Sequence, residues 1–209
     1  MDVPSFTTEP LSAEAQRDGR VRRRERNRSA IVAALGEILG AGNLEPTAEQ
    51  VATLAGVQVR TLFRHFPDMA SLHAELAGRL RAEVLPLFAA VPIDGDPAER
   101  LRRLVAARAI AFERILPFKR AGNALRWRLP FLQEHHERMV RDLRRHLLIV
   151  LPELRGRANA QAALELATSF ESWDRLRAEQ RLKPERARDA MEYAALAVVG
   201  AALGRIEKR

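Results

Sequence analysis

Apolar side chains recur every three or four residues along most of the chain, and this period constrains the fold more than any other feature. Over one stretch they are Met69, Leu72, Leu76, Leu80, Val84, Leu87 and Phe88. Such spacing places them on one face of an α-helix, whereas strands alternate apolar and polar residues. The chain also lacks runs of β-branched residues and has a single tyrosine. The sequence therefore predicts an all-α protein.

Glycine, proline and capping residues divide this pattern into about nine helices. Gly40 and Gly42 end the first helix, and Pro117 and Pro152 end two later ones. The Asp96-Pro97-Ala98-Glu99 stretch is typical of a helix start, with Asp at the N-cap and Pro at the first helical position. The predicted helices cover residues 24–40, 47–55, 58–66, 68–90, 96–116, 118–126, 130–152, 158–180 and 184–205.

A cluster of arginines lies near the start of the chain, which carries a formal charge of +8 overall. Its members are Arg17, Arg20, Arg22, Arg23, Arg24, Arg26 and Arg28, opposed only by Asp18 and Glu25. Residues 1–20 are polar and contain prolines, so we expect residues 1–23 to form a disordered basic arm. Such an arm can bind the phosphates of a nucleic acid, although a solvated tail has the same composition.

Several other kinds of protein do not fit this sequence. The chain has no cysteine, which excludes disulfides and thiolate metal sites. His135-His136-Glu137 lacks the spacing of a zinc-protease helix, and no Gly-rich phosphate loop or nucleophile elbow is present. The longest apolar run, residues 194–203, is too short to cross a bilayer, and no secretory signal precedes it. We therefore expect a cytoplasmic protein without a cofactor or metal, and not an enzyme.

Residues 47–66 read TAEQVATLAGVQVRTLFRHF and predict two short helices joined by a tight turn. Thr47 and Gln50 are spaced as a capping box, which marks the start of the first helix. Gly56 supplies the positive φ that the turn requires. The second helix then exposes Gln58, Arg60 and further polar residues, and a helix of this kind fits the major groove of DNA.

This segment resembles the helix–turn–helix of the TetR family of transcriptional regulators. The resemblance is carried by Thr47, Val51, Ala52, Ala55, Gly56, Val57 and the run Thr61-Leu62-Phe63-Arg64-His65-Phe66-Pro67-Asp68. It covers residues 24–80, and Phe170–Arg177 with Pro184–Ala187 matches the family's C-terminal part less specifically. The resemblance implies a three-helix DNA-binding domain over residues 24–70 and a helical effector-binding and dimerisation domain over residues 71–209.

The resemblance also implies roles for individual residues. Gln58, Val59, Arg60 and Thr61 would face the bases. The residues expected at phosphates, including those of the basic arm, are Arg22, Arg23, Arg24, Arg28, Thr47, Phe63, Arg64 and His65. The sequence departs from the family at Met69, where a phosphate-binding lysine is common.

The second half of the chain carries aromatic residues that either pack a core or line a ligand pocket. The pocket hypothesis assigns Phe88, Phe112, Phe118, Trp127, Phe131 and Phe170 to the lining, with Arg126, Arg128, His135 or His136 as polar contacts. A small-residue face of the last helix, made by Ala190, Ala194, Ala197 and Ala201, predicts a homodimer interface, with Leu164, Phe170, Leu196, Val198 and Leu203 adding apolar area.

Two functions remain open from the sequence. The first is a regulator, expected to be a repressor, that binds an inverted repeat in double-stranded DNA and is released by a small-molecule effector. The second is a helical ligand-binding or enzymatic bundle in which the basic arm is incidental. The exposed row of Gln58, Arg60 and Arg64 after a glycine turn favours the first, because an enzyme bundle has no use for it.

Overall fold

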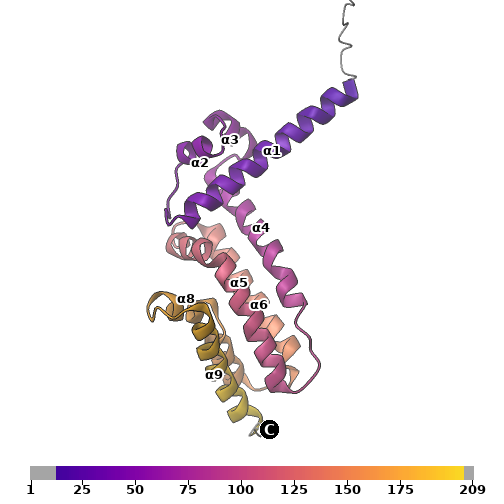
Figure 1. The fold of residues 1–209 in the computed structure, drawn as a ribbon, viewed down its shortest axis with the longest axis vertical. Coiled ribbons are helices and arrows are strands. Elements are labelled where there is room, and N and C mark those ends of the chain that lie inside the picture. Colours follow the sequence, from indigo (N-terminus) through magenta and orange to yellow (C-terminus); the bar gives the residue numbers. More distant parts are fainter. Residues whose placement is uncertain (1–12, 205–209) are drawn as a thin grey trace, which may run out of the picture.

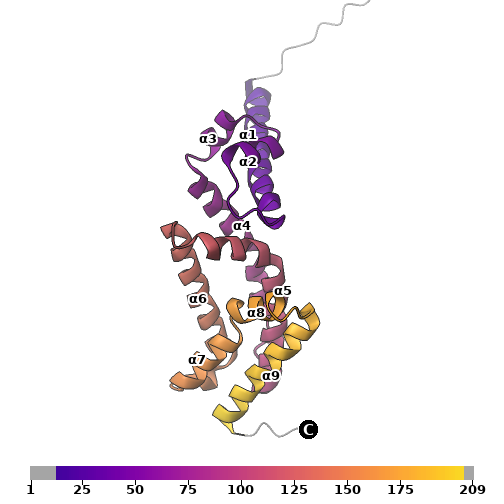
Figure 2. The same ribbon diagram turned by 90° about the vertical axis from the view of Figure 1, so that its left-hand side faces the viewer.

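The computed structural model describes residues 13–204 of the chain. Within these residues the protein forms nine α-helices, one 3-10 helix and no strand, which confirms the all-α prediction (Figures 1 and 2). The elements are α1 (Ala13–Gly40), α2 (Ala48–Leu54), α3 (Val59–His65), α4 (Met69–Ala89), α5 (Pro97–Leu125), α6 (Pro130–Val150), η1 (Pro152–Leu154), α7 (Ala158–Ala167), α8 (Phe170–Ala178) and α9 (Pro184–Leu203).

The capping signals read from the sequence act as predicted. Thr47 caps α2 in a full capping box with Gln50, and Asp96 accepts hydrogen bonds from two backbone N–H groups at the start of α5. Gly56 has a φ of +66° in the turn between α2 and α3. These interactions are local, so the sequence alone is sufficient to place them.

The basic segment differs from the prediction. Helix α1 begins at Ala13 rather than near residue 24, so residues 13–23 are helical and not a disordered arm. The remaining residues 1–12 of the predicted arm lie outside the described residues. Arginine, alanine and glutamate all favour helices, and Asp18 forms an i,i+4 pair with Arg22 at 3.3 Å. These preferences extend the helix beyond the domain that anchors it.

Two other helix boundaries also differ. Pro117 does not end α5, which continues to Leu125 and shows a marked bend in Figure 2. Proline removes one backbone hydrogen bond and kinks a helix, but packing on both sides of the kink keeps the chain helical. The helix predicted over residues 158–180 is two helices, because Ser169 caps a new start at Phe170.

Two hydrophobic cores lie along the long axis of the molecule. The first joins α1, α2, α3 and the start of α4 around Ile31, Leu35 and Leu62. The second is formed by the elements from α4 to α9, and Leu104 and Leu147 are fully buried in it. The first core extends past the predicted boundary at residue 70, because Leu72 and Leu76 of α4 and Ala121 of α5 belong to it.

Helix α4 connects the two cores. Leu72 and Leu76 lie in the first core, Val84 lies in the second, and Leu80 packs against both. Figure 1 shows α4 descending from α2 and α3 beside α5, while α8 and α9 cover the other side of α5. A rigid-body movement of α4 would therefore move the helix–turn–helix relative to the rest of the molecule.

Candidate DNA-binding surface and ligand cavity

The turn between α2 and α3 presents α3 at one end of the molecule. The backbone N–H of Val57 donates to the carbonyl of Ala52 at 2.9 Å, which closes the turn. Leu62 is the buried residue of α3, and Phe66 follows it into the same core. The other faces of this short helix are therefore directed away from the core.

The residues predicted to face bases lie at the start of α3. Gln58 is the N-cap, and its side chain makes no capping hydrogen bond. Gln58 and Arg60 are exposed, while Val59 and Thr61 are half-buried against the domain. This arrangement leaves one amide and one guanidinium group available to an approaching ligand.

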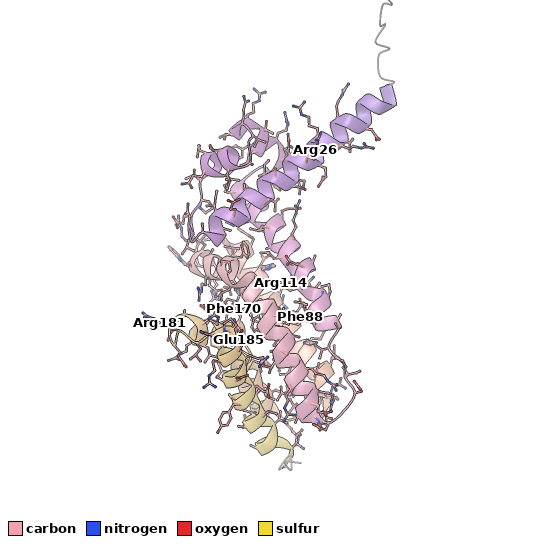
Figure 3. All side chains as sticks on the ribbon, viewed as in Figure 1. Arg26, Phe88, Arg114, Phe170, Arg181 and Glu185 are labelled. Carbon is pink, nitrogen blue, oxygen red and sulfur yellow. The ribbon has the colours of Figure 1, made fainter. Side chains whose placement is uncertain are left out.

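Most of the predicted phosphate contacts also lie on the surface. Arg22, Arg23, Arg24, Thr47 and Arg64 are exposed, and Phe63 is 43 % exposed although it is aromatic. The hydroxyl of Thr47 already accepts the Gln50 N–H, so its role at a phosphate would be shared with capping. Figure 3 shows Arg26 on the projecting half of α1, beyond the three-helix core.

Arg28 differs from the other predicted phosphate contacts because it has partners inside the protein. Its guanidinium pairs with Glu75 of α4 at 2.7 Å, donates to the carbonyl of His65 and lies 4.5 Å from the Phe66 ring centre. Arg79 also pairs with Glu75 at 3.1 Å. The structure thus assigns Arg28 to holding α1, the end of α3 and α4 together. The sequence shows no sign of this contact, which joins residues far apart in the chain.

His65 lies half-buried at the end of α3. Burial and the nearby Arg64, Arg24 and Arg28 lower the pKa of His65, and Glu25 opposes them weakly. The imidazole is therefore neutral at pH 7 and offers one N–H donor. A DNA phosphate beside it would raise its pKa again.

A cavity of about 690 Å³ lies between α4, α5 and α6, within the size range of sites for small organic ligands. Its walls are mostly apolar, and Leu80, Val84 and Phe88 of α4 form one side. Leu85, Ile93 and Ile149 line it while remaining exposed, so the rim is apolar as well.

Only some of the aromatic residues assigned to a pocket lie at this cavity. Phe88 and Phe118 line it, and so does His135. Phe112 and Phe170 instead pack edge to face at 5.6 Å, fully buried where α5 meets α8, and Figure 3 shows Phe170 at α8 apart from Phe88 on α4. Helix α5 has neighbours on two sides, and periodicity does not reveal which neighbour an aromatic residue meets.

The other residues assigned to a pocket do not line this cavity. Trp127 follows the last turn of α5 and is 80 % exposed, with Arg128 against its ring. Phe131 is half-buried near His73 but does not line the cavity, and neither do Arg126, Arg128 and His136. Arg128 instead pairs with Glu45 at 2.7 Å.

The cavity also contains polar residues that the sequence reading missed. They are His73, Arg81, Lys119, Arg138, Asp142, Arg145 and His146. Five polar lining residues, His135, Arg138, Asp142, Arg145 and His146, recur at helical spacing along α6. This polar stripe on a helix that packs into a core is the signal that could have identified the α6 residues.

Comparisons of the fold agree with the helix–turn–helix geometry. A transcriptional regulator from Rhodococcus sp. RHA1 superposes with a TM-score of 0.66 at 20% identity, covering 85% of this chain and 96% of the other. A TetR-like transcriptional regulator from the same strain gives 0.61 at 17% identity, covering 86% and 97%. No family model and no curated protein sequence matches the chain.

The chain has the fold of the TetR family. In this TetR-family fold the small-residue face of α9 lies outward. Ala194, Ala197 and Ala201 are exposed beside Tyr193, which is 80 % exposed, and Ala190 is half-buried. Leu164 and Phe170 were expected to add interface area, but both are fully buried within the chain and leave none.

No described helix is long and apolar enough to cross a membrane. The described histidine, aspartate and glutamate side chains form no group of three or more that could hold a metal ion. The candidate sites are therefore the surface around α3, the cavity between α4 and α6, and the outer face of α9.

Proposed function

We propose that this protein is a sequence-specific DNA-binding transcriptional regulator of the cytoplasm, and that it is a repressor released from its operator by a small molecule. The observation that carries the proposal is the surface of α3, where Gln58 and Arg60 are exposed at the end of the molecule beside the basic helix α1. The likeness of the fold to transcriptional regulators supports it.

In the proposed complex α3 enters the major groove. Arg60 can donate two hydrogen bonds to guanine and Gln58 can bind adenine, which are the pairings that base edges favour there. Arg64, Thr47 and the exposed arginines of α1 bind phosphates, which positions the protein without reading sequence.

One α3 is too short to specify a rare site, so the proposed regulator binds as a homodimer. The outer face of α9 is the proposed interface, because its alanines allow a partner helix to approach closely. Two α9 helices with their neighbouring α8 helices would form a four-helix bundle. The two-fold axis requires an inverted repeat, with half-sites about 34–36 Å or a multiple of this distance apart.

Helix α4 links the cavity to DNA binding in this proposal. Leu80 and Val84 line the cavity, while Leu72 of the same helix is buried in the core that also contains Leu62 of α3. A ligand that displaces α4 changes the separation of the two α3 helices and thus weakens the operator complex. Release requires the ligand to prefer the displaced state, by about 1–3 kcal/mol for a typical allosteric coupling.

Selection of bound fragments from a random duplex library tests the DNA-binding proposal. We expect enrichment of an inverted repeat that the protein still binds near physiological salt in the presence of random competitor. If no sequence is enriched, or random DNA competes equally, the helical ligand-binding or enzymatic bundle replaces the regulator. A promoter fusion carrying the selected site then distinguishes repression from activation.

A further inference from the structure

The charged residues around the cavity are mostly cationic. Arg81, Lys119, Arg138 and Arg145 line it, whereas Asp142 is its one carboxylate among the described residues. Asp142 is already paired with Arg81 at 2.8 Å. The wall therefore retains an excess of positive charge, which disfavours a cationic ligand and favours an anion.

Three imidazoles also line the cavity, one on α4 and two on α6. Burial lowers the pKa of His73, with no charged partner contributing. Burial, Lys119, Arg138 and Arg81 lower the pKa of His135 against the weaker effect of Asp142. Burial and Arg108 lower the pKa of His146 to about 4, and a hydrogen bond with the Phe88 backbone opposes them. All three are therefore neutral at pH 7, and each carries one N–H.

Lys119 also lines the cavity and lies near enough to His135 to lower the pKa of that imidazole. Its ammonium group contacts Asn123 at 2.8 Å and the Nδ1 of His136 at 2.7 Å, neither of which is a carboxylate. Burial lowers the pKa of Lys119 to about 8. Glu171 of α8 also acts on this charge and raises the pKa of Lys119, and the Nζ atom lies 5.9 Å from the centre of the Phe170 ring. An anion bound nearby would stabilise this charge.

His73 and His135 face the same space. The ring of His73 lies 6.5 Å from the ring of Phe131, and His135 is one helical turn after Phe131 on α6. From His73 to Phe88, α4 extends for about 22 Å at 1.5 Å per residue, with Leu80 and Val84 along the cavity wall. Apart from Arg81, the α4 wall below His73 is thus apolar, and the polar residues of α6 line the cavity as far as His146, whose ring lies 5.4 Å from that of Phe88.

We propose that the effector is an amphipathic carboxylate, with its head group accepting hydrogen bonds from His73 and His135 near Lys119 and its hydrocarbon body along Leu80, Val84 and Phe88. This inference rests on the proposed effector function of the cavity. It specifies the chemical class of the ligand, which the fold alone does not.

The proposal predicts proton uptake on binding. A carboxylate placed beside His73 and His135 favours their charged forms, which raises the pKa of both groups. The complex then holds more protons than the free protein, so binding strengthens as the pH falls through the raised pKa values of these two imidazoles. The groups that face these imidazoles are Arg81 on α4, Lys119 on α5, and Arg138 and Asp142 on α6.

Calorimetric titration with four ten-carbon probes tests the ligand class: decanoate, decyl phosphate, decanol and decyltrimethylammonium. We expect decanoate to bind about tenfold or more tightly than decanol, since hydrogen bonds to a charged group are the stronger ones. Repeating the titration in buffers of different ionisation enthalpy should show proton uptake with decanoate only. If decyl phosphate binds more tightly than decanoate, the effector head group is assigned as a phosphate ester instead of a carboxylate. If decanol or decyltrimethylammonium binds more tightly than decanoate, the proposal is overturned.

Variants assign the head-group site. H135Q with K119M should lower decanoate affinity about tenfold or more and reduce proton uptake, while decanol affinity is unchanged. R141Q removes a charge from the exposed face of the same helix and should change neither. Equal losses for decanoate and decanol would indicate a merely structural effect and would overturn the assignment. Binding of the selected DNA without any probe is measured separately, so failure of the DNA-binding proposal is distinguishable from failure of the ligand class.

Discussion

We expect the two exposed arginines of α3 to differ in how they affect DNA binding. Arg60 lies at the start of the helix, where bases are expected, and Arg64 lies in its last turn. R60A should cost about 1–3 kcal/mol of binding and relax the preference at one base pair, because two hydrogen bonds to guanine are removed. R64A should weaken all sequences equally. Affinities of both variants for the selected site and its single-base variants check this, and an unchanged preference in R60A would remove Arg60 from base reading.

His65 predicts a pH dependence of DNA binding. Its pKa in the free protein is lowered by burial and by Arg64, Arg24 and Arg28. A phosphate in contact with the ring raises that pKa in the complex, so the complex holds more protons and affinity rises as the pH falls through the raised pKa of His65. H65Q should flatten this dependence in DNA titrations from pH 8 to about pH 5.5, whereas H73Q, at the cavity, should not. A persistent slope in H65Q would contradict the phosphate role.

The basic half of α1 predicts salt dependence at the scale of a helix. Residues 18–26 are exposed and include five arginines beyond the three-helix core. Deleting residues 1–23 should weaken specific and random DNA together and flatten the salt dependence, by about 0.9 in slope for each phosphate that the protein no longer neutralises. Deleting residues 1–12 alone removes no arginine and should leave the slope unchanged.

The outcome that would revise this assignment is a weaker preference for A·T pairs flanking the half-sites. Such a change would make the start of α1 a minor-groove reader rather than a phosphate-binding segment.

The packing of α5, α6 and α7 depends on the buried side chain of Arg108. From α5 it donates to the hydroxyl and carbonyl of Thr168, at the end of α7, and to the carbonyl of Leu143 in α6 at 2.6 Å. The positive charge also suits the carbonyl end of α7. R108A should lower the free energy of unfolding by about 2–4 kcal/mol, because buried acceptors lose their donor. Urea unfolding measures this free energy. R102A removes an exposed ion pair between the same helix and Glu192, and it should lower the free energy of unfolding by less than about 1 kcal/mol.

If the outer face of α9 is the dimer interface, substitutions on it should change the oligomeric state of the protein. Ala194 and Ala197 are exposed on this face, so a partner helix would contact them directly. A194E or A197E should convert the proposed dimer to monomers in light scattering, because a carboxylate cannot be buried there without a partner. A124E, an exposed alanine of α5, is the matched control. A dimer that survives both α9 substitutions would place the interface elsewhere.

Loss of the dimer should also affect DNA binding. The monomeric variant retains α3 and the basic half of α1, so its affinity for random DNA should change little. Its affinity for the inverted repeat should fall steeply, since both half-sites contribute only in the dimer.

The sequence by itself determined the helices and their caps. Thr47 with Gln50, Asp96 with Pro97, and Gly56 in the turn were all predicted correctly, because the groups involved lie within four residues of one another. The helix–turn–helix followed for the same reason, and so did the outward position of Arg60. Pro117 was one local exception, since packing on both sides of the bend sustained a helix that proline disfavours, and the Ser169 cap, which divides the predicted helix 158–180, was another.

Only the tertiary structure decided which residues share the cavity. His73, Lys119 and His146 come from three helices, and no local spacing relates them. The same holds for Arg28, whose contact with Glu75 ties α1 to α4 through residues far apart in the chain. Apolar periodicity identifies a buried face, but a helix such as α5 is buried on more than one side. Phe118 therefore lines the cavity while Phe112 packs under α8, a difference set by which neighbour each side meets.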